Sequence, residues 1–134
     1  MKQLLPLVFA LAGCSKSSTP DPTPAPQLAG TWSLTAARTV TTPKNGGAAT
    51  TTNQSVTPGE TKVTYATDGT YLEINNGRTG QIGTYTYSGS TLVVTANGQS
   101  VTGTTTELTA NRLVLAINEE DAITRSAITK TFSR

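Results

Sequence analysis

The sequence predicts an all-β domain, a small eight-stranded antiparallel up-and-down barrel, behind an N-terminal segment that is not part of it. Threonine accounts for 28 of the 134 residues, and together with valine, isoleucine and tyrosine it favours half-buried, pleated strands. Convincing helical periodicity is absent from every window of the sequence. Short stretches of alternating apolar and polar residues are instead separated by turns that contain glycine or asparagine. An open two-sheet sandwich is the alternative architecture.

The first thirteen residues have the order of a secretory signal peptide. Lys2 supplies one positive charge, and residues 4–12 form a short apolar run that only Pro6 interrupts. A helix that crosses a membrane needs ~20 consecutive apolar residues, whereas this run ends before Cys14. We therefore expect residues 1–13 to act as an export signal rather than as a membrane span.

The residues around Cys14 resemble the lipobox of bacterial lipoproteins. Leu11, Ala12 and Gly13 match the residues that precede the cysteine in that motif. The resemblance implies that the Cys14 thiolate is alkylated by a diacylglyceryl group and that a peptidase then cuts before it. Two or three acyl chains would hold the mature chain firmly on a membrane. The alternative is an ordinary secretory signal with an incidental cysteine.

Residues 14–27 are expected to be a tether that contributes nothing to the core. Four of the chain's seven prolines lie here among serine and threonine, a composition that favours extended polyproline II. At about 3.1 Å per residue the tether would span up to ~40 Å. A ligand for a proline-binding module and a glycosylated stalk are the alternatives. Because residues 15–18 lack the acidic side chains of some surface-exposed lipoproteins, we expect a lipid-anchored envelope protein that faces the periplasm.

The remaining residues, 28–134, are numerous enough for one hydrophobic core. The expected strands cover residues 30–42, 61–67, 70–75, 81–87, 91–96, 99–109, 112–118 and 122–132. Successive hairpins leave exposed strand edges unless the sheet closes on itself, which predicts a barrel with its apolar face inward. The segment 43–59, rich in glycine, threonine and asparagine, is expected to be a flexible lid or flap at the barrel mouth.

Turn sequences predict which residues pair across each hairpin. A two-residue turn at Asp68-Gly69 would pair Tyr65 with Leu72, which leaves Glu73 on the outer surface. The turn at Asn97-Gly98 would pair Val94 with Val101, and the turn at Ala110-Asn111 would pair Leu108 with Leu113. The turn at residues 88–90 would place Tyr85 and Tyr87 on the same face as Leu92 and Val94. A β-bulge is expected near Gly103.

Several segments together resemble the lipocalin-like domain of bacterial lipoproteins. They are LAGTW at 28–32, TDGTY at 67–71, GTYTY at 83–87, LVV at 92–94 and ELTANRLVL at 107–115. The resemblance implies a lipocalin-like barrel over residues 28–134, in which Trp32 plugs one end and a late arginine, Arg125 or Arg134, packs across the indole. Two features depart from the pattern. The Thr-Asp-Tyr turn motif of lipocalins has no counterpart, and residues 43–59 form a long insert.

The resemblance also implies a binding module that holds a small hydrophobic molecule inside the barrel. The residues expected to line such a cavity are Trp32, Tyr65, Tyr85, Tyr87, Leu92 and Val94. A purely structural role is the alternative for Trp32, and the tyrosines would otherwise fill the barrel. A filled barrel would act as a structural or protein-interaction module of the cell envelope, since fold alone does not fix function.

Catalysis and cofactor binding are not expected. The chain has no histidine and a single cysteine, so histidine-based and thiolate-based catalytic or metal sites cannot be assembled. The acidic residues within 118–121 could offer oxygen ligands to calcium, but their spacing favours a solvated turn. The net charge is only +2 and the basic residues are scattered, which argues against nucleic acid. We expect a monomer whose partners are a membrane, a small ligand or an envelope protein.

Cys14→Ser is expected to abolish lipidation and membrane fractionation together, because the acyl chains would be attached through this thiol. Intact-mass measurement after expression in bacteria, combined with cell fractionation, checks both effects. A variant that still fractionates with the membrane would refute the anchoring prediction.

Overall fold

The computed structural model of the protein describes residues 27–134, and nine antiparallel strands make up this part of the chain. They are β1 (Gly30–Pro43), β2 (Thr50–Gln54), β3 (Thr61–Tyr65), β4 (Thr70–Asn75), β5 (Arg78–Ser88), β6 (Thr91–Ala96), β7 (Gln99–Leu108), β8 (Arg112–Glu120) and β9 (Thr124–Ser133). All nine belong to one sheet in the order β2-β1-β3-β4-β5-β6-β7-β8-β9. Within the described residues, no helix is long and apolar enough to cross a membrane.

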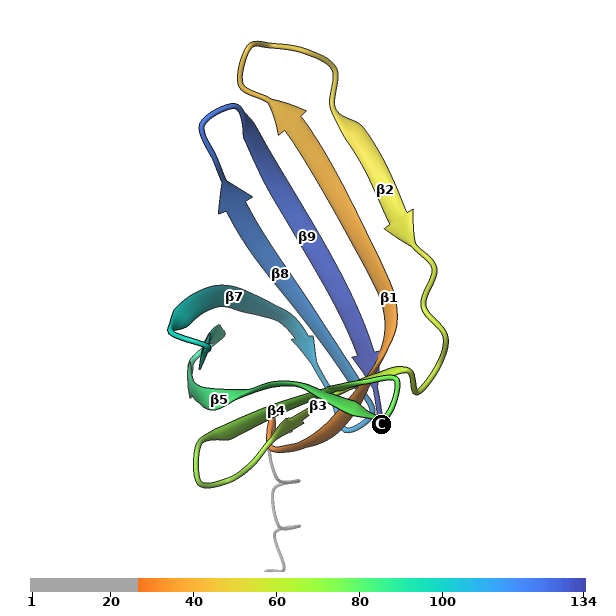
Figure 1. Ribbon diagram of the computed structural model, residues 1–134, viewed down its shortest axis with the longest axis vertical. Coiled ribbons are helices and arrows are strands. Elements are labelled where there is room, and N and C mark those ends of the chain that lie inside the picture. The colour runs from red at the N-terminus through yellow and green to blue at the C-terminus, as the bar shows by residue number, and fades with distance from the viewer. Residues whose placement is uncertain (1–26) are drawn as a thin grey trace, which may run out of the picture.

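The sheet closes into a barrel because β1 also pairs with β9. The first residues of β1, from Gly30 to Ser33, pair with β3, while its other edge pairs with β9 from Ser33 to Pro43. Eight strands, β1 and β3 to β9, therefore form a closed antiparallel up-and-down barrel (Figure 1). The expected fold class is confirmed, and the alternative of an open sandwich is excluded by the closure.

Residues 43–59, expected to be a flexible lid or flap, contain a strand that the sequence pattern did not predict, β2. β2 pairs with the second half of β1, from Ala37 opposite Gln54 to Thr41 opposite Thr50. β1 has 14 residues, of which only four pair with β3. The rest of that edge needs another partner for its backbone hydrogen-bonding groups. The sequence of β2, TTTNQ, has no apolar alternation, so the pattern could not reveal it.

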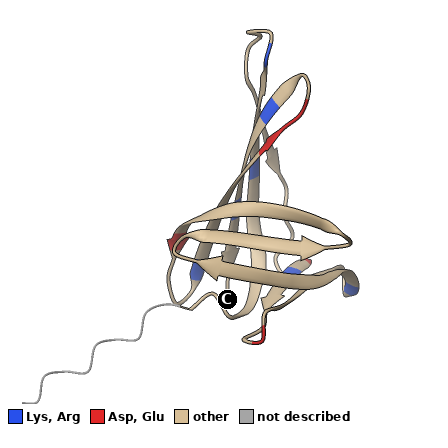
Figure 2. Cartoon of the chain, turned by 90° about the vertical axis from the view of Figure 1, so that its left-hand side faces the viewer, with Lys and Arg blue, Asp and Glu red and all other residues tan. Residues whose placement is uncertain are grey.

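The strands beyond the closed barrel form what we call the projecting sheet: β2, the second half of β1, most of β9 and the end of β8 (Figure 1). Charged residues of both signs lie near its tip (Figure 2). Lys44 Nζ lies 2.7 Å from Glu120 Oε1, and Arg125 Nε lies 3.4 Å from Glu120 Oε2. These exposed ion pairs add little stability, but they connect the end of β1 to the β8–β9 turn.

Strand bounds agree with the expected ones within about three residues at most ends. β4 and β6 begin and end as expected, whereas β5 begins at Arg78 rather than at residue 81. The cause is a two-residue turn at Asn76-Gly77, whose φ angles of 51° and 71° are both positive. Asparagine followed by glycine favours this geometry, so the sequence did contain the signal for the earlier start of β5.

Most of the expected pairings are confirmed. Val94 pairs with Val101, Tyr85 with Val94, Tyr87 with Leu92, and Leu108 with Leu113. Asn97 and Gly98 have φ angles of 52° and 75°, the left-handed geometry of a two-residue hairpin turn. The bulge expected near Gly103 is present in β7 but lies further along, between Thr105 and Glu107.

The pairing expected around Asp68-Gly69 is wrong by one residue. Tyr65 pairs with Tyr71, and Val63 pairs with Glu73. The loop has three residues, 67–69: the Gly69 N–H donates to the Ala66 carbonyl at 3.1 Å, and the Ala66 N–H donates to the Thr70 carbonyl at 2.9 Å. Gly69, with φ of 87°, supplies the left-handed residue that such loops need. A one-residue slip exchanges the faces of a strand, so Glu73 points inward and Leu72 outward.

A tryptophan and an arginine seal one end of the barrel. Trp32 is fully buried, and its Nε1 donates to the Leu28 carbonyl at 2.8 Å. The guanidinium carbon of Arg134 lies 4.1 Å from the Trp32 ring centroid. Arg134, not Arg125, is therefore the arginine that packs across the indole. Gly30 makes room for it, because a Cβ there would lie 2.7 Å from Arg134 Nη1.

Trp32→Ala is expected to lower the free energy of unfolding by roughly 3–5 kcal/mol, because it empties a fully buried indole site. Denaturant unfolding monitored by circular dichroism measures the change. Ile82→Ala is the matched control, since Ile82 is 61% exposed and its truncation should cost little. A loss below about 1 kcal/mol for Trp32→Ala would contradict the role of the indole as the plug of the barrel.

Candidate functional site

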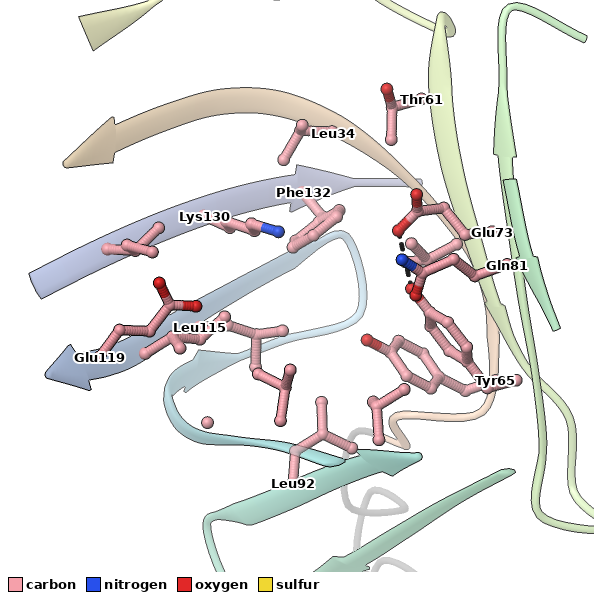
Figure 3. Close-up of a pocket in the computed structure, with 17 residues that line it drawn as sticks. Leu34, Thr61, Tyr65, Glu73, Gln81, Leu92, Leu115, Glu119, Lys130 and Phe132 are labelled. Carbon is pink, nitrogen blue, oxygen red and sulfur yellow. Dashed lines mark hydrogen bonds between the residues drawn. The ribbon is translucent and has the colours of Figure 1, made fainter. Parts of the chain in front are cut away.

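The barrel holds a cavity of about 200 Å³ that extends toward the projecting sheet (Figure 3). Its apolar lining residues are Leu34, Val63, Leu92, Val94, Val101, Leu115, Ile117, Ile128 and Phe132. Its polar and charged lining residues are Thr61, Tyr65, Tyr71, Glu73, Gln81, Glu119 and Lys130, and Gly103 completes the wall. A mostly apolar cavity with a few polar groups is typical of sites for small molecules.

The six residues expected to line a cavity fall into two groups. Tyr65, Leu92 and Val94 line the cavity, whereas Trp32, Tyr85 and Tyr87 lie outside its lining and pack in or against the core. The Tyr85 hydroxyl is used structurally, since it donates to the Ala66 carbonyl at 2.8 Å. Contact of any of the six with a ligand stays a prediction.

Tyr65 is the most deeply buried polar residue of the cavity wall, with only 3% of its surface exposed. Its ring meets the Tyr85 ring edge-on at 5.0 Å between centroids and lies 5.6 Å from the Tyr71 ring. Figure 3 shows the Tyr65 hydroxyl pointing into the cavity, where no residue within 27–134 forms a hydrogen bond with it. Burial, reinforced by the charge of Glu73, raises the pKa of Tyr65. The hydroxyl is therefore a neutral donor.

Glu73 brings a carboxylate into the same cavity, where it is held by two donors. The Tyr71 hydroxyl donates to Glu73 Oε2 at 2.9 Å, and Asn75 Nδ2 donates to Oε1 at 2.7 Å. The Thr61 hydroxyl in turn donates to Asn75 Oδ1 at 2.8 Å. Burial and the adjacent Glu73 raise the pKa of Tyr71, so its hydroxyl keeps its proton and remains a donor. Each Glu73 oxygen is thus occupied by an internal hydrogen bond.

Gly80 creates the space for this hydrogen-bond network. A Cβ at Gly80 would lie 2.6 Å from Asn75 Nδ2 and 3.3 Å from Glu73 Oε1. The strand is also irregular here, because the pairing of β4 with β5 shifts between Glu73 and Ile74. Glu73 was expected on the outer surface, and this hydrogen-bonded group was not predicted from the sequence. The three-residue loop at 67–69 was the signal that would have placed it inside.

Two further charged residues line the cavity, Lys130 from β9 and Glu119 from β8. Lys130 is half-buried and lies between Ile128 and Phe132 on the inward face of its strand. Glu119 is exposed and lies at the end of the cavity next to the projecting sheet. Within the described residues, neither takes part in an ion pair.

Two of the three acidic residues at 118–121, which could have offered ligands to calcium, have structural roles. Asp121 accepts hydrogen bonds from the Ile123 and Thr124 backbone N–H groups at 2.8 and 2.6 Å, and these bonds lower its pKa. The hydrogen bond and charge of Lys44 lower the pKa of Glu120. Within residues 27–134, no group of three or more histidine, cysteine, aspartate or glutamate residues could hold a metal ion. Cys14, the expected lipidation site, lies outside the described residues.

Comparison with known proteins gives one match. A family model described as a lipocalin-like domain matches residues 28–115. This range covers Trp32, the three tyrosines whose rings meet at the cavity wall (Tyr65, Tyr71 and Tyr85) and the strands from β1 into β8. No curated protein and no solved structure shows a significant match to the chain.

Tyr65 is expected to stay protonated in the folded protein at about pH 11, where tyrosines of an unfolded chain are mostly ionised. Its raised pKa stabilises the fold below the ordinary tyrosine pKa, and this contribution is lost as the pH rises above about 10. Tyr65→Phe should leave the tyrosinate absorbance of the folded protein at that pH unchanged. The absorbance of the unfolded chain should fall by one of four tyrosines. A one-tyrosine decrease in the folded protein would contradict the burial of this hydroxyl.

Proposed function

This chain belongs to the family of lipocalin-like domains, and on that premise we propose that it binds a small hydrophobic molecule inside its barrel. The observation that supports the proposal is the cavity itself, which is lined mainly by apolar side chains. The family is generally one of binding domains rather than enzymes, and we propose the same for this chain. Neither a cofactor nor a metal is part of the proposal.

The size of the cavity limits the ligand. Its volume is about 200 Å³, while drug-sized ligands occupy pockets of about 300–1,000 Å³. An apolar cavity of about 150 Å³ is already large enough to bind benzene. The ligand is therefore a compact molecule, which can be as small as a single aromatic ring and is smaller than a typical drug. Removing its apolar surface from water would supply most of the binding free energy.

The second part of the proposal is that Cys14 is lipidated and anchors the domain to a membrane of the cell envelope, on the periplasmic side. The lipobox resemblance of residues 11–14 and the proline-rich segment that follows support it. The described chain begins at the sealed end of the barrel, since the Leu28 carbonyl accepts from the Trp32 indole. The cavity extends along β8 from Leu115 to Glu119, away from that end. A tether attached at residue 27 would leave the cavity mouth free.

The projecting sheet favours a second candidate function, a protein-interaction module of the envelope. All five side chains of β2 are exposed, and none of them is charged. Its outer edge has no neighbouring strand among the described residues. Unpaired edges without charged or proline residues can accept a strand from another protein. This role does not require an empty barrel, so the two candidates are separated by whether the cavity binds a ligand.

Native mass spectrometry of the purified protein tests ligand binding directly. We expect a bound molecule that is lost on denaturation, or binding of added short-chain hydrophobic compounds. Val94→Trp should abolish the added mass, because an indole at this lining position fills the cavity. Val93→Trp is the matched control, since its side chain lies on the opposite face of β6. A ligand-free mass with every compound tested would favour the protein-interaction module instead.

A further inference from the structure

We propose that the ligand of the cavity is a small amphiphilic anion, a compact apolar molecule with a carboxylate that binds the Lys130 ammonium. This inference rests on the proposed function and specifies the chemical class of the ligand. It depends on the balance of charges inside the cavity and on two polar groups of the wall that lack partners within the described residues.

Lys130 is an uncompensated cation among apolar neighbours. Its side chain comes from the inward face of β9, between Ile128 and Phe132, and lies opposite Leu115 of β8. Figure 3 places its ammonium at the cavity. Among residues 27–134, no carboxylate lies within 4.0 Å of it and no hydrogen bond to it is formed. A half-buried charge without a counter-ion is unfavourable, and a bound anion would relieve that cost.

The two carboxylates of the wall do not supply the missing counter-ion. Both oxygens of Glu73 accept hydrogen bonds from inside the protein, from Tyr71 and Asn75. Glu119 is exposed at the cavity end, where water solvates it. Each acidic group is therefore satisfied by the protein or by solvent, whereas the cation is not. A positively charged ligand would have to share Glu73 with the two donors that already hold it, whereas an anionic ligand would find two donors without a partner among the described residues.

Tyr65 supplies the second observation. Tyr65 is only 3% exposed, and its hydroxyl points into the cavity. This hydroxyl has no hydrogen-bond partner within the described part of the chain. The hydroxyl oxygen is accessible from the cavity, because Thr105 Oγ1 is the only fully buried polar side-chain atom without a partner among the described residues. A ligand oxygen at this position would accept the Tyr65 hydrogen bond in a largely apolar environment, where such a bond is stabilising. An apolar molecule with an oxygen-bearing acidic group satisfies Tyr65 and Lys130, whereas a pure hydrocarbon satisfies neither.

Three probes of equal chain length test the proposal: octanoate, 1-octanol and octylamine, titrated into the purified protein at neutral pH by calorimetry. We expect octanoate to bind about 10-fold tighter than octanol, because hydrogen bonds to charged groups are the stronger class, and octylamine to bind weakest.

Lys130→Met keeps an unbranched side chain without the charge, and it should remove the preference for octanoate. Lys62→Met is the matched control, because Lys62 is exposed on β3. Tyr65→Phe should weaken octanoate and octanol alike.

The outcomes separate this inference from the proposed function. If octanol binds as tightly as octanoate, or if Lys130→Met keeps the preference, the anion assignment is overturned while the cavity remains a binding site. Tightest binding of octylamine would show that the cavity selects cations and would overturn it as well. If none of the three probes binds, both the proposed function and this inference fail. The comparison of probes on the unmodified protein decides these cases even if a variant does not fold.

Discussion

The stacking of Arg134 on Trp32 closes one end of the barrel and so sets the direction in which the cavity extends. The guanidinium lies 4.1 Å from the indole centroid and also donates to the carbonyls of Ala29 and Ala110 at 3.0 and 2.7 Å. A cation over a tryptophan contributes on the order of 1 kcal/mol, but its position matters more than its energy. The last residue of the chain joins the start of β1 to the β7–β8 turn. Because this end is sealed, the cavity extends only toward the projecting sheet.

The length of β1 explains both halves of the architecture. Its first residues pair with β3 and close the barrel, and its later residues pair with β2 and leave the barrel. The change occurs just after a register shift between Leu34 and Ala36, and an extra residue of this kind bends a strand and increases its twist. The same stretch of β9 and β8 that continues into the projecting sheet carries Ile128 and Glu119 at the cavity wall. The length of β1 therefore accounts both for the closure of the barrel and for the sheet that projects beside the cavity.

The sequence allowed most of the barrel to be predicted, and the exceptions have specific physical causes. Asn97-Gly98 fixed the pairing of its hairpin because both residues tolerate positive φ. The predicted register of the hairpin at 67–69 was wrong by one residue because its loop contains three residues rather than two. Since side chains alternate between the two faces of a strand, a shift of one residue assigns each side chain to the wrong face. β2 was not predicted because its own sequence, TTTNQ, has no apolar alternation and its pairing depends on how far β1 extends beyond β3. Local propensity does not encode that length.

The same reasoning explains why the candidate site was predicted only in part. Inward positions were inferred from apolar residues, so Leu92, Val94 and Tyr65 were found, while Glu73 was assigned to the outer surface. Yet every second residue of β9 points inward, and Lys130 lies at such a position between Ile128 and Phe132. The alternation therefore predicts an inward side chain for the lysine as well as for its two apolar neighbours. A charge at an inward position contradicts the rule that determines the rest of the strand. Such contradictions are expected where function, rather than stability, determines the residue. The charged exceptions to the alternation therefore support the proposed binding chemistry more directly than the apolar majority does.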